Sequence, residues 1–323
     1  MPKYSVVRYT DKYFDRWNTF VDESNNGTLF HRLDFLEYHG EKYLENEHHL
    51  LILKGESIFA VLPLAVFSGI AKSPFASSFG GIVFKRTLSL SEAVTIVETL
   101  VDYFEGCGWD ECILQSAPYC YHKQQNSYID FALLKNGFQL EVSEIFNVID
   151  LPDSYEELWF DIYQGRCRTT LRKTKEQFEI DTNASLDEFY MILMEDKVRH
   201  GNSRPTHTQG ELKILKETFP EKVYFEIAYH KETMARAGVC YFQPSKDCVL
   251  TFYMSQENKA LKLDGINYLI DHAIRRSITN GIKYFDFGAS TIGLEVENYG
   301  VSKFKESFGA KGFSRSLFKW KNV

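Results

Sequence analysis

The sequence predicts an α/β protein made of two domains of similar layout, residues 1–150 and 151–323, each a mixed sheet flanked by helices. Three observations support this prediction. The chain of 323 residues is longer than one average domain. Each half shows the same order of hairpin, strand, helix and strand. The turn residues Glu56 and Glu232, and the helix-ending Gly108 and Gly281, recur at nearly the same separation, which favours a duplication over a coincidence of common elements.

The first half begins with an amphipathic helix, because Phe14, Trp17, Phe20 and Val21 fall on one face of the segment 12–21. The other elements follow from apolar runs that are separated by glycine-containing turns. We expect a helix over 33–39, a hairpin of 49–53 and 57–67, a strand over 81–84, a helix over 91–104 and a strand over 109–115.

The second half begins after a strand that ends near 147–152, where Asp153 and Ser154 are suited to cap a new helix over 154–178. A strand, a helix and a further strand in sequence predict a parallel crossover beside an antiparallel hairpin, and therefore a mixed sheet. We expect strands over 223–229, 234–242, 248–254 and 283–287, and a helix over 263–279.

Composition narrows the class of protein. Hydrophobic residues make up 44% and charged residues 25%, as in ordinary globular proteins. The net charge of −7 argues against extended binding to nucleic acid, although a local basic patch stays open. The most apolar run, 58–67, is too short to span a bilayer and contains Pro63, and the N-terminus lacks the layout of a signal peptide. The six cysteines form no CxxC pair, so we expect a cytoplasmic protein without a structural metal.

The predicted helix 154–178 carries a local reversal of charge. Its second half holds five cations and no acid between 166 and 175. Arg168 and Arg172 are spaced i, i+4 and share a face, so the pair is suited to bind one phosphate. The alternative is a solvated helix whose cations are favoured by its C-terminal end.

Three further segments hold candidate residues. The polar loop 199–208 contains Arg199 and His207, and His207 is a candidate general base, with loop hydrogen bonding as the alternative. Asp286 is acidic within an apolar strand, which indicates a functional or a paired carboxylate. In the segment 298–310, Phe304 and Phe308 pack on the core, and Lys305 points elsewhere, as an available cation or a surface lysine.

Several motifs are absent from the sequence. There is no GxSxG, no P-loop, no GxGxxG and no HExxH. This argues against a hydrolase with an activated serine and against nucleotide hydrolysis.

The order of several segments resembles the Fem-type aminoacyltransferases of peptidoglycan bridges and the related acetyltransferase-like proteins of polysaccharide loci. In the first half the resemblance rests on 17–39 and on 73–81, which include Ser24-Asn-Asn-Gly-Thr28 and Ser78-Phe-Gly-Gly81. In the second half it rests on 166–175, 199–208, 285–290 and 298–309. The resemblance covers nearly the whole chain and implies two tandem domains of the GNAT (acyl-CoA N-acyltransferase-like) type.

The resemblance also implies transfer of an acyl or aminoacyl group to an amine, without a covalent enzyme intermediate. By position, Phe304 and Lys305 match the family's segment near the reacting ester, which makes Lys305 a candidate for charge stabilisation. Arg168 and Arg172 match the region that faces a phosphate-bearing acceptor. His207 and Asp286 complete the expected catalytic set, and Arg199 and Tyr253 complete the expected substrate-binding set.

Two departures from the family bear on the acyl donor. The segment 196–219 has no sustained heptads, unlike the coiled-coil insertion common in enzymes that use aminoacyl-tRNA. The glycine-rich turn of acetyl-CoA users is reduced to Gly265. We expect acyl-CoA as donor, with aminoacyl-tRNA as the alternative, and a nucleotide- or lipid-linked amino sugar or peptidoglycan precursor as acceptor. A non-catalytic module that binds a sugar nucleotide is the competing interpretation, and no feature of the sequence indicates an oligomeric state.

Overall fold

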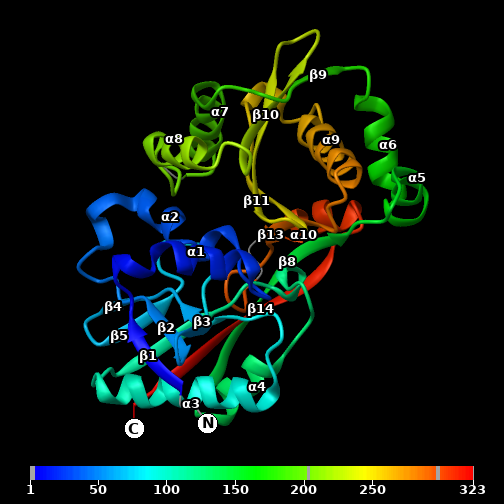
Figure 1. The fold of residues 1–323 in the computed structure, drawn as a ribbon. Helices are drawn as coiled ribbons and strands as arrows, with labels where there is room; N and C mark the ends of the chain where they lie inside the picture. The colour runs from blue at the N-terminus through cyan, green and yellow to red at the C-terminus, as the bar shows by residue number, and fades with distance from the viewer. Residues whose placement is uncertain (1–3, 202–203, 296–298, 323) are drawn as a thin grey trace. The chain divides into compact units, whose positions relative to one another are not determined.

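The computed structural model describes residues 4–201, 204–295 and 299–322. The chain forms two compact units (Figure 1). The first holds residues 1–145, 291–295 and 313–323, and the second holds 146–290 and 296–312. Most of the last strand of the chain therefore belongs to the first unit. Each unit is formed by segments that are not continuous in the sequence. The division of the chain into two domains, 1–150 and 151–323, stays a prediction.

The first unit is built from short strands and a pair of packed helices. Its strands are β1 (Tyr4–Arg8), β2 (Leu50–Lys54), β3 (Ser57–Leu62), β4 (Ala65–Phe67), β5 (Ile70–Ser73), β6 (Val83–Phe84), β7 (Glu111–Gln115) and most of β14 (Lys311–Lys321). Its helices are α1 (Phe14–Glu23), α2 (Leu33–Leu36), α3 (Leu90–Gly106) and α4 (Tyr128–Lys135). The sheet order is β1-β2-β3-β6 in one group and β4-β5-β7-β14 in the other.

Strand β2 shows why both faces of the first group are covered. Its sequence is a continuous apolar run, as in strands that are buried on both sides. Leu50 and Ile52 pack in the core with α3, whereas Leu51 and Leu53 pack with Trp17 of α1. The predicted first helix and the predicted hairpin are confirmed, but the helix expected over 33–39 ends at Leu36 and continues as a 3₁₀ turn.

The second unit holds a mixed sheet with helices on both faces. Its strands run in the order β8-β13-β12-β11-β10-β9. They are β8 (Gln139–Asp150, from residue 146 on), β9 (Phe178–Asp181), β10 (Val223–His230), β11 (Arg236–Ser245), β12 (Cys248–Gln256) and β13 (Tyr284–Ala289). Its helices are α5 (Tyr155–Glu157), α6 (Gly165–Thr174), α7 (Leu186–Arg199), α8 (Gln209–Thr218), α9 (Gly265–Thr279) and α10 (Tyr299–Ser307).

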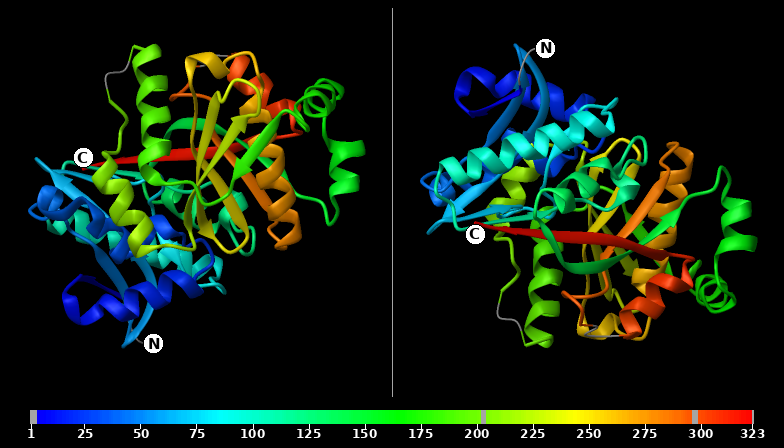
Figure 2. Two further views of the ribbon diagram at one scale, coloured as in Figure 1. Left: turned by 90° about the horizontal axis from the view of Figure 1, so that it is seen from above. Right: turned by 90° about the horizontal axis from the view of Figure 1, so that it is seen from below.

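The layers of the second unit follow from side-chain alternation along the strands. Ala237, Val239 and Tyr241 face the core beneath α9, and Gly238 faces Phe189 of α7 on the other side. Helix α9 lies between the sheet and α6 in both views (Figures 1 and 2). Strand β12 pairs antiparallel with β11 and parallel with β13, with α9 as the crossover, so the predicted mixed sheet is confirmed.

One predicted element is wrong. The continuous helix expected over 154–178 is divided into α5, a π-helical turn at Leu158–Ile162 (η5) and α6. Tyr163 and Gln164 adopt extended backbone angles between the turn and α6. Arg168 stabilises this break, because its Nη1 donates to the carbonyls of Trp159, Phe160 and Tyr163. Apolar periodicity does not reveal such a break, since the break depends on a side chain that binds backbone groups.

In the part of the chain that the structure describes, we find no helix with both the length and the apolar character needed to cross a membrane.

The end of α10 provides a test of the packing against the π-helical turn. Gly309 has a φ of +86°, and a Cβ there would meet the side chain and backbone of Ile162. We expect Gly309→Ala to lower the free energy of unfolding by about 3 kcal/mol or more, because backbone strain and a steric clash add together. Urea unfolding followed by circular dichroism measures this loss.

Gly281→Ala is the matched control, because Gly281 has a φ of +68° and an added Cβ would meet nothing within 4 Å. Backbone strain alone should cost about 1 kcal/mol there. Equal losses in the two variants would contradict the proposed clash with Ile162.

Candidate functional site

Strands β12 and β13 separate at their carboxyl ends. Their parallel pairing runs from Cys248 and Tyr284 to Leu250 and Asp286, whereas β12 continues to Gln256. Beyond Asp286, the pairing of β13 with β8 also shifts register, and Gly288 takes a φ of +75°. In open α/β sheets, ligands bind outside the carboxyl ends of parallel strands. The separation therefore creates a position for a ligand.

A cavity of about 370 Å³ lies at this position, and we call it the strand-end cavity. The end of β12, the end of α7, the start of α9 and one face of α10 line it. The lining residues are Asp196, Arg199, His200, Met254, Ser255, Gln256, Leu261, Asp264, Ile266, Asn267, Gly300, Val301 and Phe304. The first turn of α9 leaves backbone N–H groups without intrahelical partners, as every helix start does, and these groups favour anions. Arg199 and Phe304, two of the predicted site residues, thus lie in one cavity.

Arg199 is held firmly in the cavity wall. Its Nη1 donates to the carbonyl of Gln256 at 3.0 Å and to the Asn258 side chain at 3.2 Å. Its Nη2 forms an ion pair with Asp196. Phe304 is half-buried and packs edge-on against Phe287 and Phe308 of the core.

Lys305 is buried beside this cavity but does not line it. Only 2% of its surface is exposed, and its Nζ donates to the carbonyls of Gly288 at 3.0 Å and Ala289 at 2.6 Å. Burial lowers the pKa of Lys305 to about 8, although the negative charge of Asp286 acts in the opposite direction. The amine therefore remains mainly charged at pH 7. The structure places Lys305 at the end of β13, inside the molecule rather than on its surface.

Asp286 is fully buried and belongs to the same group of contacts. Its Oδ1 accepts a hydrogen bond from the backbone N–H of Gly288 at 2.7 Å. Lys305 and Asp286, which sequence reasoning named separately, therefore meet at one bend of the backbone.

His207 and Tyr253 form a second pair. The Nδ1 of His207 lies 2.8 Å from the hydroxyl oxygen of Tyr253, and burial raises the pKa of Tyr253 to about 12. Tyr253 pairs with Cys240, and its neighbour Met254 pairs with Val239, so the two side chains point to opposite faces of β12. Met254 lines the strand-end cavity, whereas His207 and Tyr253 are not among its lining residues.

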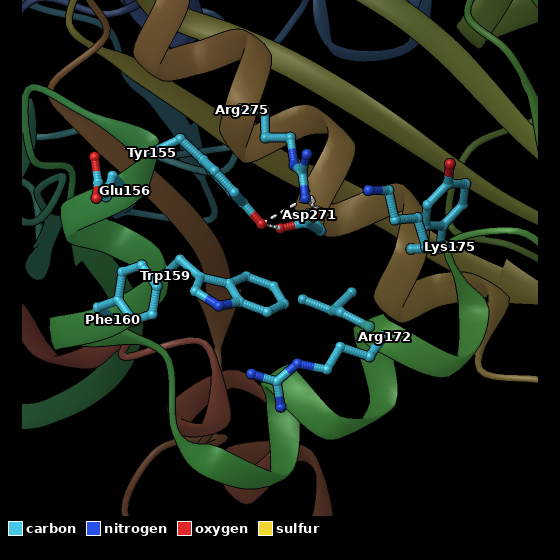
Figure 3. Close-up of a pocket in the computed structure, with 10 residues that line it drawn as sticks. Tyr155, Glu156, Trp159, Phe160, Arg172, Lys175, Asp271 and Arg275 are labelled. Carbon is cyan, nitrogen blue, oxygen red and sulfur yellow. Dashed lines mark hydrogen bonds and ion pairs between the residues drawn. The ribbon is translucent and has the colours of Figure 1, made fainter.

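Arg168 and Arg172 lie in different surroundings. Arg168 binds the three carbonyls of the π-helical turn described above. Arg172 instead lines a second cavity, of about 400 Å³, between α6 and α9 (Figure 3), which we call the α6 cavity. The structure gives Arg168 a role in the fold, and its part in binding phosphate stays a prediction.

Sequence reasoning missed several residues around these cavities. Asp196 and Asn267 of the strand-end cavity, and Tyr155, Asp271 and Arg275 of the α6 cavity, carry no recognisable motif. A sequence pattern could have indicated Asp271 and Arg275. The two residues are spaced i, i+4, and Asp271 lies among apolar positions of a predicted helix. Within the described ranges, no group of three His, Cys, Asp or Glu side chains is arranged to hold a metal ion.

Comparison with known proteins supports the fold. No protein-family model matches the chain, and neither does any curated protein sequence. Among solved structures, FemX matches with a TM-score of 0.69 and 12% identity, over 98% of this chain and 97% of that chain. L-PGS from Bacillus licheniformis matches with a TM-score of 0.60 and 13% identity, over 96% of this chain and 92% of that chain. A tandem GNAT protein from the clavulanic acid biosynthesis pathway matches with a TM-score of 0.55 and 10% identity, over 99% of this chain and 98% of that chain. The predicted resemblance to Fem-type and tandem GNAT proteins is thereby confirmed for the fold.

The lowered pKa of Lys305 predicts a pH-dependent stability. Folded Lys305 loses its proton near pH 8, whereas the unfolded lysine keeps it up to about 10.5. Between these values the unfolded chain binds more protons, so the free energy of unfolding rises with pH. Between about pH 8 and 10.5, the free energy of unfolding of the wild-type protein should therefore rise by up to about 3 kcal/mol more than that of Lys305→Met.

Urea unfolding of both proteins from pH 7.5 to 10 measures this difference. Subtracting the Lys305→Met profile removes the contribution of tyrosines that titrate in the same range. Parallel profiles for wild type and variant would contradict a buried amine that changes its charge near pH 8.

Proposed function

We propose that this protein is an N-acyltransferase that moves an acyl group from an acyl thioester, acyl-CoA, to an amine of a cell-envelope precursor. The acceptor proposed is a nucleotide- or lipid-linked amino sugar or peptidoglycan precursor, and the proposed location is the cytoplasm. The observation that carries the proposal is the strand-end cavity at the end of β12, beyond the point where β12 and β13 diverge, with Arg199 and Phe304 in its wall and Lys305 beside it. The likeness in fold to FemX and to a tandem GNAT protein supports it.

The chemistry of the strand-end cavity suits an anionic, elongated donor. The start of α9 and the side chains of Arg199 and His200 lie on its wall, and helix starts attract phosphate groups. Met254, Val301 and Phe304 supply an apolar part for the chain that carries the thioester. Asp196 and Asp264 also line the wall. Asp196 forms an ion pair with Arg199, whereas Asp264 directly precedes the first turn of α9 and opposes part of the attraction for an anion.

The proposed reaction needs no covalent enzyme intermediate. The neutral amine of the acceptor attacks the thioester carbonyl and a tetrahedral intermediate with an oxyanion forms. Its collapse re-forms the carbonyl and breaks the C–S bond, and the proton that the amine loses passes, directly or through water, to the departing sulfur, so the products are the amide and the CoA thiol. A positive charge near the oxyanion lowers the barrier. We assign this charge to Lys305, whose ammonium is buried against the carbonyls of Gly288 and Ala289 and is still charged at pH 7.

An aminoacyl-tRNA donor is the second candidate. The cations of α6 favour it, because Arg166, Arg172 and Lys173 are exposed on a helix with no acid between 166 and 175. Binding of tRNA through these residues should weaken steeply with salt. A sugar-nucleotide-binding module without transfer activity is the third candidate and predicts acceptor binding alone.

Thermal unfolding with acetyl-CoA tests the donor site. Saturation at about 100 times the dissociation constant should stabilise the wild-type protein by about 2.7 kcal/mol. Val301→Trp should abolish this stabilisation, because Val301 lines the cavity and a larger side chain fills it. Lys303→Trp is the control, since Lys303 is exposed on the same helix but is not a lining residue. Equal stabilisation of Val301→Trp and Lys303→Trp by acetyl-CoA would mean that the donor binds outside the strand-end cavity. If acetyl-CoA does not stabilise the wild-type protein, the tRNA-dependent transferase and the sugar-nucleotide-binding module are favoured instead.

Turnover tests the role of Lys305. With acetyl-CoA and a panel of free and nucleotide-linked amino sugars, release of the CoA thiol reports transfer. Lys305→Met should lower kcat by about 100-fold or more with little change in KM for acetyl-CoA, because a charge that acts on the oxyanion contributes to the transition state alone. Lys303→Met should retain wild-type kcat, and unchanged kcat in a folded Lys305→Met variant would end this assignment.

A further inference from the structure

The α6 cavity is separate from the strand-end cavity, because the two share none of their lining residues among the described parts of the chain. It has a volume of about 400 Å³. Three pieces of the chain form its walls: the segment of α5 and η5, the helix α6, and the exposed side of α9. The lining residues are Tyr155, Glu156, Trp159, Phe160, Leu171, Arg172, Lys175, Tyr268, Asp271 and Arg275.

The break at residues 163–164 gives the cavity its shape. Because the chain turns between η5 and α6, the aromatic side chains of the first segment face the basic side chains of α6 across a space (Figure 3). Arg168 holds the break through its hydrogen bonds to three carbonyls. The two walls are therefore fixed without any ligand.

The aromatic wall is fixed to α9 by a buried carboxylate. Asp271 is only 2% exposed and accepts hydrogen bonds from the hydroxyl groups of Tyr155 at 2.9 Å and Tyr163 at 3.0 Å. Arg275 donates to Asp271 at 2.8 Å and lies 3.9 Å from the centre of the Tyr155 ring. A wall whose rotamers are already set loses little entropy when a ligand binds.

Two of the three cations of the cavity, Arg172 and Lys175, are not neutralised by the described part of the protein. Among the described residues, the side chains of Arg172 and Lys175 have no hydrogen-bond or ion-pair partner, and Arg172 lies only over the ring of Trp159, at 5.5 Å. Arg172 and Arg275 approach the cavity from opposite helices (Figure 3). The acids in the lining are Glu156 and Asp271, and Asp271 is paired with Arg275. The two unpaired cations beside the aromatic rings disfavour a cationic ligand, although aromatic rings without these cations would suit one.

We propose that the α6 cavity binds a small phosphorylated molecule that also carries a planar or apolar group. Its phosphate would bind Arg172 and Lys175, since a guanidinium matches the geometry of phosphate oxygens. Its planar or apolar group would pack on Trp159 and Tyr155. The proposal does not rest on acyl transfer, because the ligand would bind here whatever the strand-end cavity holds.

Isothermal titration calorimetry of the full chain tests this proposal with four probes: uridine 5′-monophosphate, n-hexyl phosphate, inorganic phosphate and uridine. We expect at least one of the two organic phosphates to bind about tenfold or more tightly than both inorganic phosphate and uridine, because each of these lacks one half of the ligand. A nucleotide preference indicates a planar group, and a preference for hexyl phosphate indicates an alkyl chain. Absence of binding by both organic phosphates at millimolar concentration would overturn the proposal.

Matched variants locate the site. Arg172→Gln should weaken binding of the preferred probe about tenfold, and Trp159→Leu should remove its preference over inorganic phosphate. Lys173→Met is the control, because Lys173 is exposed on the same helix and does not line the cavity. An equal loss in Lys173→Met would overturn the proposal in favour of a diffuse effect of charge. Acetyl-CoA itself carries phosphates and a planar base, so its stabilising effect is also measured in the Arg172→Gln protein. Stabilisation equal to that of the wild type shows that the donor site is intact and that the lost probe binding belongs to the α6 cavity.

Discussion

The candidate active site depends on the contact between the ammonium group of Lys305 and the backbone at the end of β13. Gly288 takes a left-handed conformation there, and its N–H turns to the carboxylate of Asp286. The carbonyls of Gly288 and Ala289 are thereby directed to Lys305, which donates to both. Unsatisfied buried carbonyls are costly, so this bend and the lysine require each other. The bend lies where β13 leaves β12, and the lysine belongs to the helix whose other side chains line the strand-end cavity.

This contact has an energetic cost that the surrounding charges reduce only in part. Burying an ammonium group disfavours its charged form, and Asp286 restores some of the lost stabilisation. A methionine or leucine in the same space would avoid the cost of burial but would leave the carbonyls unsatisfied. A buried cation that is charged at neutral pH is also suited to act on a developing negative charge nearby. Lys305 can therefore serve both the fold and the proposed chemistry. Its hydrogen bonds to the carbonyls affect the free energy of unfolding, whereas its charge near the oxyanion affects kcat.

The fold could be predicted from the sequence where the signal is local. The continuous apolar run of β2, the glycine-containing turn after it and the crossover through α9 all follow from periodicity and turn residues. The break before α6 could not be predicted, because it rests on hydrogen bonds from Arg168 to carbonyls up to nine residues away. The candidate site was predicted as separate residues. That Lys305 meets Asp286, or that Asp271 fixes the Tyr155 ring, depends on contacts between distant segments that one sequence does not encode in a readable pattern.

The distribution of charge explains how an acidic protein can favour anionic ligands. The chain has a net charge of −7, which at long range repels an anion. At physiological ionic strength, however, exposed charges are screened beyond about 8 Å, so the nearest side chains decide the potential that a bound ligand experiences. Around the α6 cavity these are Arg172 and Lys175, together with Glu156 and the ion pair of Arg275 with Asp271. At the strand-end cavity they are the start of α9, the ion pair of Arg199 with Asp196, and the carboxylate of Asp264. An anion is thus favoured close to Arg172 and Lys175, whereas at the strand-end cavity the helix start and the carboxylate of Asp264 act in opposite directions. The position at which an anion binds is then decided by local geometry, because the overall negative charge offers no long-range attraction.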